Sequence, residues 1–260
     1  MIDLTCHFLT GPDCGPVTFE ESQSLCRAAC DNEVRGFVFT PRWKADRQDP
    51  PLPLETCNQE IERLRAVLAP DIDLRLGFEL QFSSELPALV DQYGGALALA
   101  GKRHLLISLP ANTIPGNAGN VWSELLSRQF RIIISQPESR PALRRHPETI
   151  RSWIEKGIKL QINAASILGW HGRECRKVAF SYLESYVESS LVASNGHAGN
   201  GDAGAMKQAR EELTKIFGER RARKWLHDLP AEILGSNVRA HAAVARPFAQ
   251  RFSFLRHFIS

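Results

Sequence analysis

Short apolar runs of strand length alternate with helical patterns along most of the chain, and this alternation limits the fold more than any other feature of the sequence. The runs are apolar at consecutive positions and mostly β-branched, which is typical of strands buried on both faces of a parallel sheet. Seven strands are predicted, at residues 2–4, 36–39, 74–77, 105–109, 132–134, 159–162 and 191–193.

Helical patterns lie between the predicted strands, at residues 18–30, 54–68, 118–128, 149–156, 173–187 and 203–217. The first of them begins with Thr18, which has the residue type of an N-cap, and Glu21 three residues later completes a capping-box pattern. About seven strand–helix units without a break in composition predict a barrel-like α/β fold.

Composition limits the class of protein. The 260 residues are 43% hydrophobic and 23% charged, which suits one large globular α/β domain or two small ones. No apolar run reaches the roughly 18–20 residues that span a bilayer, and the first residues lack the basic and apolar regions of a signal peptide. We therefore expect a cytoplasmic protein whose six cysteines are reduced.

Basic charge is concentrated at the end of the chain. Residues 237–260 hold four arginines and no acidic residue, and the remainder carries 28 basic against 29 acidic residues. A nearly neutral body argues against a nucleic-acid partner. We divide the chain into a barrel domain, residues 1–236, and a basic, aromatic tail, residues 237–260. The tail is suited to an anionic membrane surface or a protein partner, or it is a final helix packed on the barrel, or a frayed end.

Polar residues follow the predicted strands at the points where they end. In barrels of this kind the chemistry lies where strands end and loops begin, so these positions predict a polar pocket. They are Thr5 and His7; Thr40 to Arg42; Gly77 to Glu79; Ser108 to Pro110; Ser135 to Glu138; and Ser194 to His197.

The same positions, taken in order, resemble the motifs of the polymerase-and-histidinol-phosphatase (PHP) superfamily, in its branch of bacterial capsular and exopolysaccharide protein-tyrosine phosphatases. The resemblance covers roughly residues 1–235 and implies a distorted TIM-like (β/α)7 barrel. The motifs that carry it are the opening from Met1 to Pro16, Thr40-Pro41, Gly77 with Glu79, Gln136-Pro137-Glu138, Ala193 to His197 and Leu229 to Leu234.

The resemblance implies a phosphatase site with up to three divalent cations, expected to be manganese, held by about nine His, Asp and Glu ligands. Clustered cations offset the charge of a phosphoester and lower the pKa of bound water. Only three of the implied ligands stand in this chain, namely His7, Glu79 and His197. The others are replaced by Thr5, Cys14, Arg42, Ser108, Gln136 and Asn195, with Asp13 beside Cys14 as a weak candidate, and Ser139 replaces an expected arginine.

These replacements leave three hypotheses open. In the first, the protein keeps little or no hydrolysis and binds a phosphotyrosine-like anion, with Arg42 as the anchor. The neutral donors of that anion pocket would be Thr5, Ser108, Gln136 and Asn195. A guanidinium beside a dication is electrostatically unfavourable, which argues against the full cluster.

In the second hypothesis one Mn or Zn ion remains and supports weak phosphatase or phosphoesterase activity. Its ligands would be His7, Glu79, His197 and Cys14. In the third, the chain is a non-catalytic module at a membrane-bound tyrosine kinase. A tyrosine-phosphorylated protein or tyrosine kinase is the expected partner, and a homo-oligomer is left open.

Overall fold

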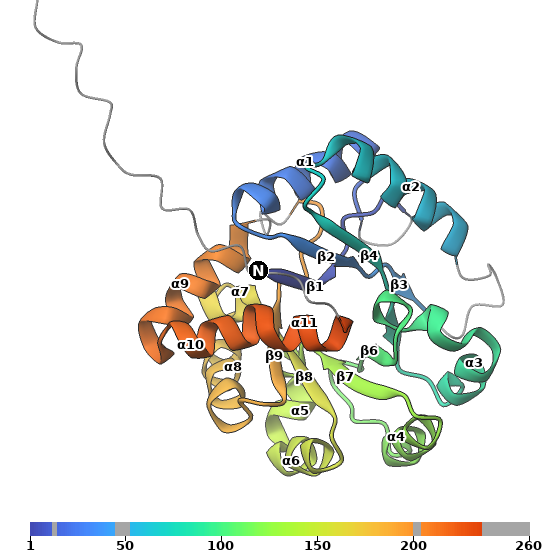
Figure 1. Cartoon of the computed structure of the whole chain (residues 1–260). Coiled ribbons are helices and arrows are strands. Elements are labelled where there is room, and N and C mark those ends of the chain that lie inside the picture. Colours follow the sequence, from blue (N-terminus) through green and yellow to red (C-terminus); the bar gives the residue numbers. More distant parts are fainter. Residues whose placement is uncertain (12–14, 45–52, 200–203, 236–260) are drawn as a thin grey trace, which may run out of the picture.

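The computed structural model describes residues 1–11, 15–44, 53–199 and 204–235, and these residues form two parallel sheets surrounded by helices (Figure 1). The three-stranded sheet has the order β1-β2-β4, and the six-stranded sheet has the order β3-β5-β6-β7-β8-β9. The strands are β1 (Ile2–Cys6), β2 (Gly36–Phe39), β3 (Arg42–Trp43), β4 (Asp73–Leu76), β5 (Glu79–Gln81), β6 (His104–Ser108), β7 (Arg131–Ser135), β8 (Lys159–Asn163) and β9 (Ser190–Ala193).

All seven predicted strands are present, and β3 and β5 are additional. The two extra strands are short continuations. Two residues separate the end of β2 from the start of β3, and two separate the end of β4 from the start of β5. Each of them pairs in the six-stranded sheet, whereas β2 and β4 pair in the three-stranded one. A periodicity argument misses strands of two and three residues because it needs a run of about four to eight residues.

The two sheets meet again at β1 and β9. Cys6 forms an isolated parallel bridge with Gly196, and the backbone N–H of Asn195 donates to the carbonyl of Thr5 at 2.8 Å. Both sheets also face one apolar interior, which contains Leu4 of β1, Val38 of β2 and Ile133 of β7. The predicted mixed α/β fold with parallel sheets is thus confirmed, whereas closure of the predicted distorted TIM-like (β/α)7 barrel is not, because the strands pair as two sheets.

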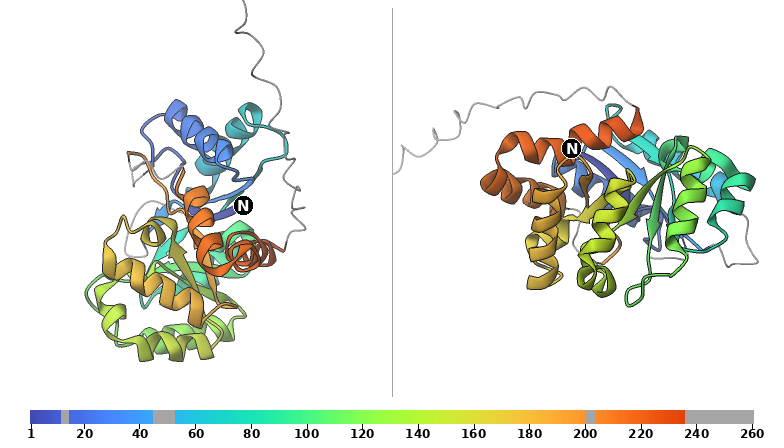
Figure 2. Two further views of the ribbon diagram at one scale, coloured as in Figure 1. Left: turned by 90° about the vertical axis from the view of Figure 1, so that its left-hand side faces the viewer. Right: turned by 90° about the horizontal axis from the view of Figure 1, so that it is seen from below.

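Helices cover the outside of both sheets (Figures 1 and 2). α1 and α2 lie beside the three-stranded sheet, and α9, α10 and α11 follow one another at the end of the described chain. They are α1 (Phe19–Asp31), α2 (Leu54–Val67), α3 (Leu86–Tyr93), α4 (Ala118–Ser127), α5 (Pro141–Arg145), α6 (Pro147–Glu155), α7 (Ala164–Leu168), α8 (Arg173–Ser185), α9 (Ala205–Phe217), α10 (Glu219–Arg223) and α11 (Leu229–Leu234).

α11 covers the amino-terminal side of the interior. Ile233 and Leu234 join the inner apolar cluster together with Ile2, and α11 contacts β1 directly. Burial of these side chains closes this side of the fold with apolar contacts. The opposite side, where the parallel strands end, is therefore the side left for polar groups.

The predicted N-cap of α1 is confirmed, and the rest of the capping box is displaced by one residue. The hydroxyl of Thr18 accepts from the amide of Glu21 at 3.2 Å, while the Glu21 carboxylate accepts from the amide of Val17 at 2.8 Å. The reach to Val17 satisfies a different amide from the one in the usual reciprocal pattern.

No helix within residues 1–11, 15–44, 53–199 and 204–235 is long and apolar enough to cross a bilayer. The predicted tail, residues 237–260, lies outside the described residues, as do Asp13 and Cys14. The proposals made for them from the sequence stay predictions.

Candidate anion-binding site

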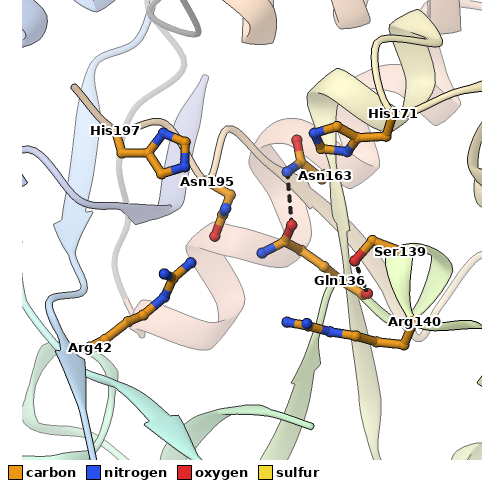
Figure 3. Close-up of a pocket in the computed structure, with 8 residues that line it drawn as sticks. All are labelled: Arg42, Gln136, Ser139, Arg140, Asn163, His171, Asn195 and His197. Carbon is orange, nitrogen blue, oxygen red and sulfur yellow. Dashed lines mark hydrogen bonds between the residues drawn. The ribbon is translucent and has the colours of Figure 1, made fainter. Parts of the chain in front are cut away.

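A cavity of ≈ 200 Å³ opens where the strands end, and every residue that lines it is polar. We refer to it as the polar pocket (Figure 3). Its side chains come from the segments that follow β2, β7, β8 and β9, so segments distant in sequence share one site. The lining residues are Arg42, Gln136, Ser139, Arg140, Asn163, His171, Asn195 and His197.

Glu79 lies beneath the pocket in a buried polar network. Its Oε2 atom is 2.9 Å from Nε of Arg42 and 3.4 Å from Nε2 of His7, and its Oε1 atom accepts from the hydroxyl of Ser135 at 2.7 Å. Burial by itself would raise the pKa of Glu79, but the charges of His7 and Arg42 and the hydrogen bonds lower it below its usual value. Glu79 is thus held as a carboxylate.

Gln136 and Asn195 have the same unusual backbone. Gln136 directly follows β7 and Asn195 lies two positions after the end of β9, and each has a positive φ, 48° for Gln136 and 49° for Asn195. Non-glycine residues at positive φ are strained, and such strain gathers at functional sites. At both positions a strained backbone conformation orients a side chain that lines the polar pocket.

Hydrogen bonds fix the two amide side chains. Nδ2 of Asn163 donates to Oε1 of Gln136 at 3.0 Å, so the NH₂ group of Gln136 is directed into the pocket (Figure 3). Oδ1 of Asn195 lies 3.3 Å from Nε2 of His7. Asn163 is held in turn, because its backbone N–H donates to Oε1 of Glu138 at 2.9 Å. The pocket thus presents an oriented donor before any ligand arrives.

Glu138 supports the pocket from behind and does not line it. It is fully buried, and desolvation raises its pKa to about 7, against the effect of the hydrogen bond from Asn163. Its Oε2 atom has no hydrogen-bond partner among the described residues.

The structure brings together part of the predicted site. Arg42, Gln136, Asn195 and His197 line the pocket. His7 and Glu79 lie below it, within hydrogen-bonding or near hydrogen-bonding distance of lining residues. Thr5 is fully buried in β1, and the hydroxyl of Ser108 donates to the carbonyl of Leu80 at 3.4 Å, so neither is among the lining residues.

Four lining residues are not among the pocket residues predicted from the sequence, although Ser139 was noted as the replacement of an expected arginine: Ser139, Arg140, Asn163 and His171. Asn163 could have been predicted from the sequence, because it follows the predicted strand at residues 159–162 as the other candidates follow theirs. Arg140 could also have been predicted, because it follows directly on Ser139, where an arginine is expected. No sequence pattern points to His171, which comes after α7. In the structure its Nδ1 atom lies 3.0 Å from the hydroxyl of Ser166.

The described residues do not fit the implied metal cluster. No three His, Cys, Asp or Glu side chains among them are grouped so that they could hold one ion. The ring centroids of His7 and His197 are 6.3 Å apart, and the Arg42 guanidinium already occupies one side of the Glu79 carboxylate. A divalent ion there would face a fixed positive charge, which is unfavourable in a buried site.

Parallel sheets around an apolar interior, with a polar pocket where the strands end, define a mixed α/β protein whose candidate site lies at the carboxyl ends of its strands. Residues 1–235 match the sequence profile of the capsular polysaccharide synthesis family CpsB/CapC, and the chain belongs to this family.

Its relatives include named tyrosine phosphatases. The tyrosine-protein phosphatase YwqE of Bacillus subtilis is 26% identical over 222 residues, covering 84% of this chain and 85% of the relative. The tyrosine-protein phosphatase CpsB of Streptococcus pneumoniae is 24% identical over 249 residues, covering 90% and 98%.

Solved structures share the fold. A crystal structure reported for YwqE and CpsB as metal-dependent tyrosine phosphatases matches with a TM-score of 0.80 at 24% identity, over 90% of this chain and 94% of the other. A lactonase from Listeria monocytogenes matches with a TM-score of 0.58 at 12% identity, over 90% and 94%. At these identities the matches concern the fold alone.

Proposed function

We propose that this protein binds a phosphorylated tyrosine, or a similar anionic group, in the polar pocket and has lost the multinuclear metal-dependent hydrolysis implied by its family. The observation that carries the proposal is the ion pair between Arg42 and Glu79, 2.9 Å from Nε to Oε2. The guanidinium of Arg42, which stays charged, lies beside the carboxylate of Glu79. At these positions the family resemblance implies a histidine and a metal ion.

The chemistry of the lining supports an anion as the ligand. Two guanidinium groups, those of Arg42 and Arg140, reach the pocket, and Gln136 adds an oriented amide donor. No carboxylate lines the pocket among the described residues. Guanidinium and amide donors suit the oxygens of a phosphate group.

A tyrosine-phosphorylated protein or a tyrosine kinase of capsule synthesis is the partner we propose, because the relatives are tyrosine-protein phosphatases and the family is one of capsular polysaccharide synthesis. Loss of cleavage would turn a phosphatase-like pocket into a binding site for the same group.

Calorimetric titration of the full chain with a phosphotyrosine peptide and with its unphosphorylated form tests binding. The proposal expects binding of the phosphorylated peptide only, unchanged by EDTA. A phosphatase assay with added Mn²⁺, run beside metal analysis of the purified protein, tests hydrolysis. Turnover that depends on Mn²⁺, together with two or three bound ions per chain, would overturn the proposal.

The second candidate is a phosphoesterase with one metal ion. It draws on the 3.4 Å approach of His7 to Glu79 and on the nearby ring of His197. Cys14, its fourth proposed ligand, lies outside the described residues. One equivalent of Zn or Mn that is lost in the Cys14→Ser variant would favour this candidate, and protein free of metal after purification in the presence of both ions would reject it.

A further inference from the structure

The guanidinium of Arg140 lies in the polar pocket, and no described residue forms an ion pair with it. Its Nε atom is buried and has no hydrogen-bond partner, and no salt bridge joins this side chain to any residue that the structure describes. Figure 3 shows the side chains of Arg140 and Arg42 extending toward the same space. A buried donor without a partner costs free energy, more so when it carries charge.

Arg42 has the opposite surroundings. Its Nε atom is engaged by Glu79, and in the ladder between β3 and β5 the two residues stand directly opposite each other. The positive charge of Arg42 is thus largely neutralised inside the protein. The charge of Arg140 is not, and burial together with the nearby charge of Arg42 lowers its pKa, although Glu79 and Glu138 act against this.

The backbone places Arg140 where it is by a sequence of constraints. Gln136 turns the chain with φ at 48°, and the short helical turn Pro137–Ser139 follows. Its last residue donates a hydroxyl hydrogen bond to the carbonyl of Gln136 at 2.8 Å. Pro141 begins α5 and keeps Arg140 in an extended conformation, with φ at −96° and ψ at 108°. The backbone conformation of residues 136–141 therefore places the guanidinium of Arg140 in the pocket.

We propose that Arg140 is the principal anion-binding residue of the polar pocket and that Arg42 serves first as the counter-ion of Glu79. The inference rests on the proposed function and adds to it the residue that recognises the ligand. The ligand class is a tetrahedral oxyanion, such as a phosphate monoester, whose oxygens can accept two hydrogen bonds from one guanidinium.

Titration of the full chain with a phosphotyrosine peptide, and separately with inorganic phosphate, tests this ranking. Arg140→Gln should weaken binding of both ligands by about tenfold or more, since hydrogen bonds to charged groups are of that strength. Arg140→Lys should recover part of the loss because it restores the charge without the fork of donors. Arg145→Gln is the matched control, an exposed arginine on α5, and should change affinity less than about twofold.

The double variant Arg42→Gln with Glu79→Gln removes the internal ion pair as a unit. It should weaken binding by about threefold, clearly less than Arg140→Gln, because one charge of each sign is lost. Arg140→Gln should also unfold at a higher temperature than the natural chain, since a buried charge without a partner is removed. A residue with a merely structural role would lower this temperature.

Two results would overturn the inference while leaving the proposed function standing. One is natural affinity in Arg140→Gln, and the other is a loss in the double variant as large as that in Arg140→Gln. If the natural chain binds neither the phosphotyrosine peptide nor phosphate, the proposed function itself fails, and the inference fails with it.

Discussion

Arg42 and Glu79 stand opposite each other on the paired strands β3 and β5, and Nε of Arg42 lies 2.9 Å from Oε2 of Glu79. The carboxylate is almost completely buried, whereas the arginine side chain is 38% exposed. A short ladder of two residue pairs thus places a solvent-reaching cation over a buried anion. The family resemblance implies this carboxylate as a metal ligand, and in this structure it forms an ion pair with a side chain of the protein itself.

Arg42→Gln should lower the free energy of unfolding by about 1–3 kcal/mol, because Glu79 then keeps a buried charge with fewer partners. The partial exposure of Arg42 places the loss below that of a fully buried pair. Adding Glu79→Gln to this variant should recover most of the stability. Urea denaturation of the natural chain and the single and double variants measures both effects, and an equal loss in both variants would show that the charge of Glu79 is not the cause.

The contributions of Asp3 and Glu138 to stability should fall as pH rises from about 4 toward about 7. Burial raises the pKa of Asp3 to about 6 and that of Glu138 to about 7, so the folded chain keeps protons that the unfolded chain has released. Glu138→Gln should remove about one proton from this dependence, which flattens the slope by up to about 1.4 kcal/mol per pH unit. Denaturation at a series of pH values measures the slope, and identical slopes would show that Glu138 does not titrate in this range.

Gln136→Gly should be more stable than Gln136→Ala by about 1 kcal/mol. Both variants lose the hydrogen bond with Asn163, but only glycine adopts a φ of 48° without strain. Both should bind the phosphotyrosine peptide more weakly than the natural chain, since the amide donor is gone. Thermal unfolding measures the difference, and a more stable alanine variant would mean that the left-handed backbone is not strained at this position.

The basic, aromatic segment 237–260 leads us to expect binding to anionic vesicles. Its four arginines without an acidic residue should attract an anionic surface by roughly 1 kcal/mol per charge. In co-sedimentation with vesicles that contain anionic lipid, the full chain should be found in the pellet with the vesicles. A chain ending at Gly235 should stay in the supernatant. Vesicles of neutral lipid are the control. Equal behaviour of the two chains would assign the segment another role.

The seven longer strands, the main helices and the family could all be predicted from the amino-acid sequence. Strand-length apolar runs are a local signal, and the burial of such runs in parallel sheets follows from their composition. The replacements at Arg42, Gln136 and Asn195 were also readable, because motif order identifies each position without any knowledge of distances.

Which of these residues lie together in the pocket, and which pair with each other, depends on the tertiary structure. Whether Ser108 or Asn163 reaches the pocket depends on strand register and on loop paths, and the pairing of Arg42 with Glu79 depends on β3 and β5, which are too short to be seen as a pattern. Arg140 comes one position after Ser139, and the turn at Gln136 places it in the pocket, where no ion pair joins it to the part of the chain that the structure describes. Such contacts join residues far apart in the chain, so they are set by packing and not by local preference.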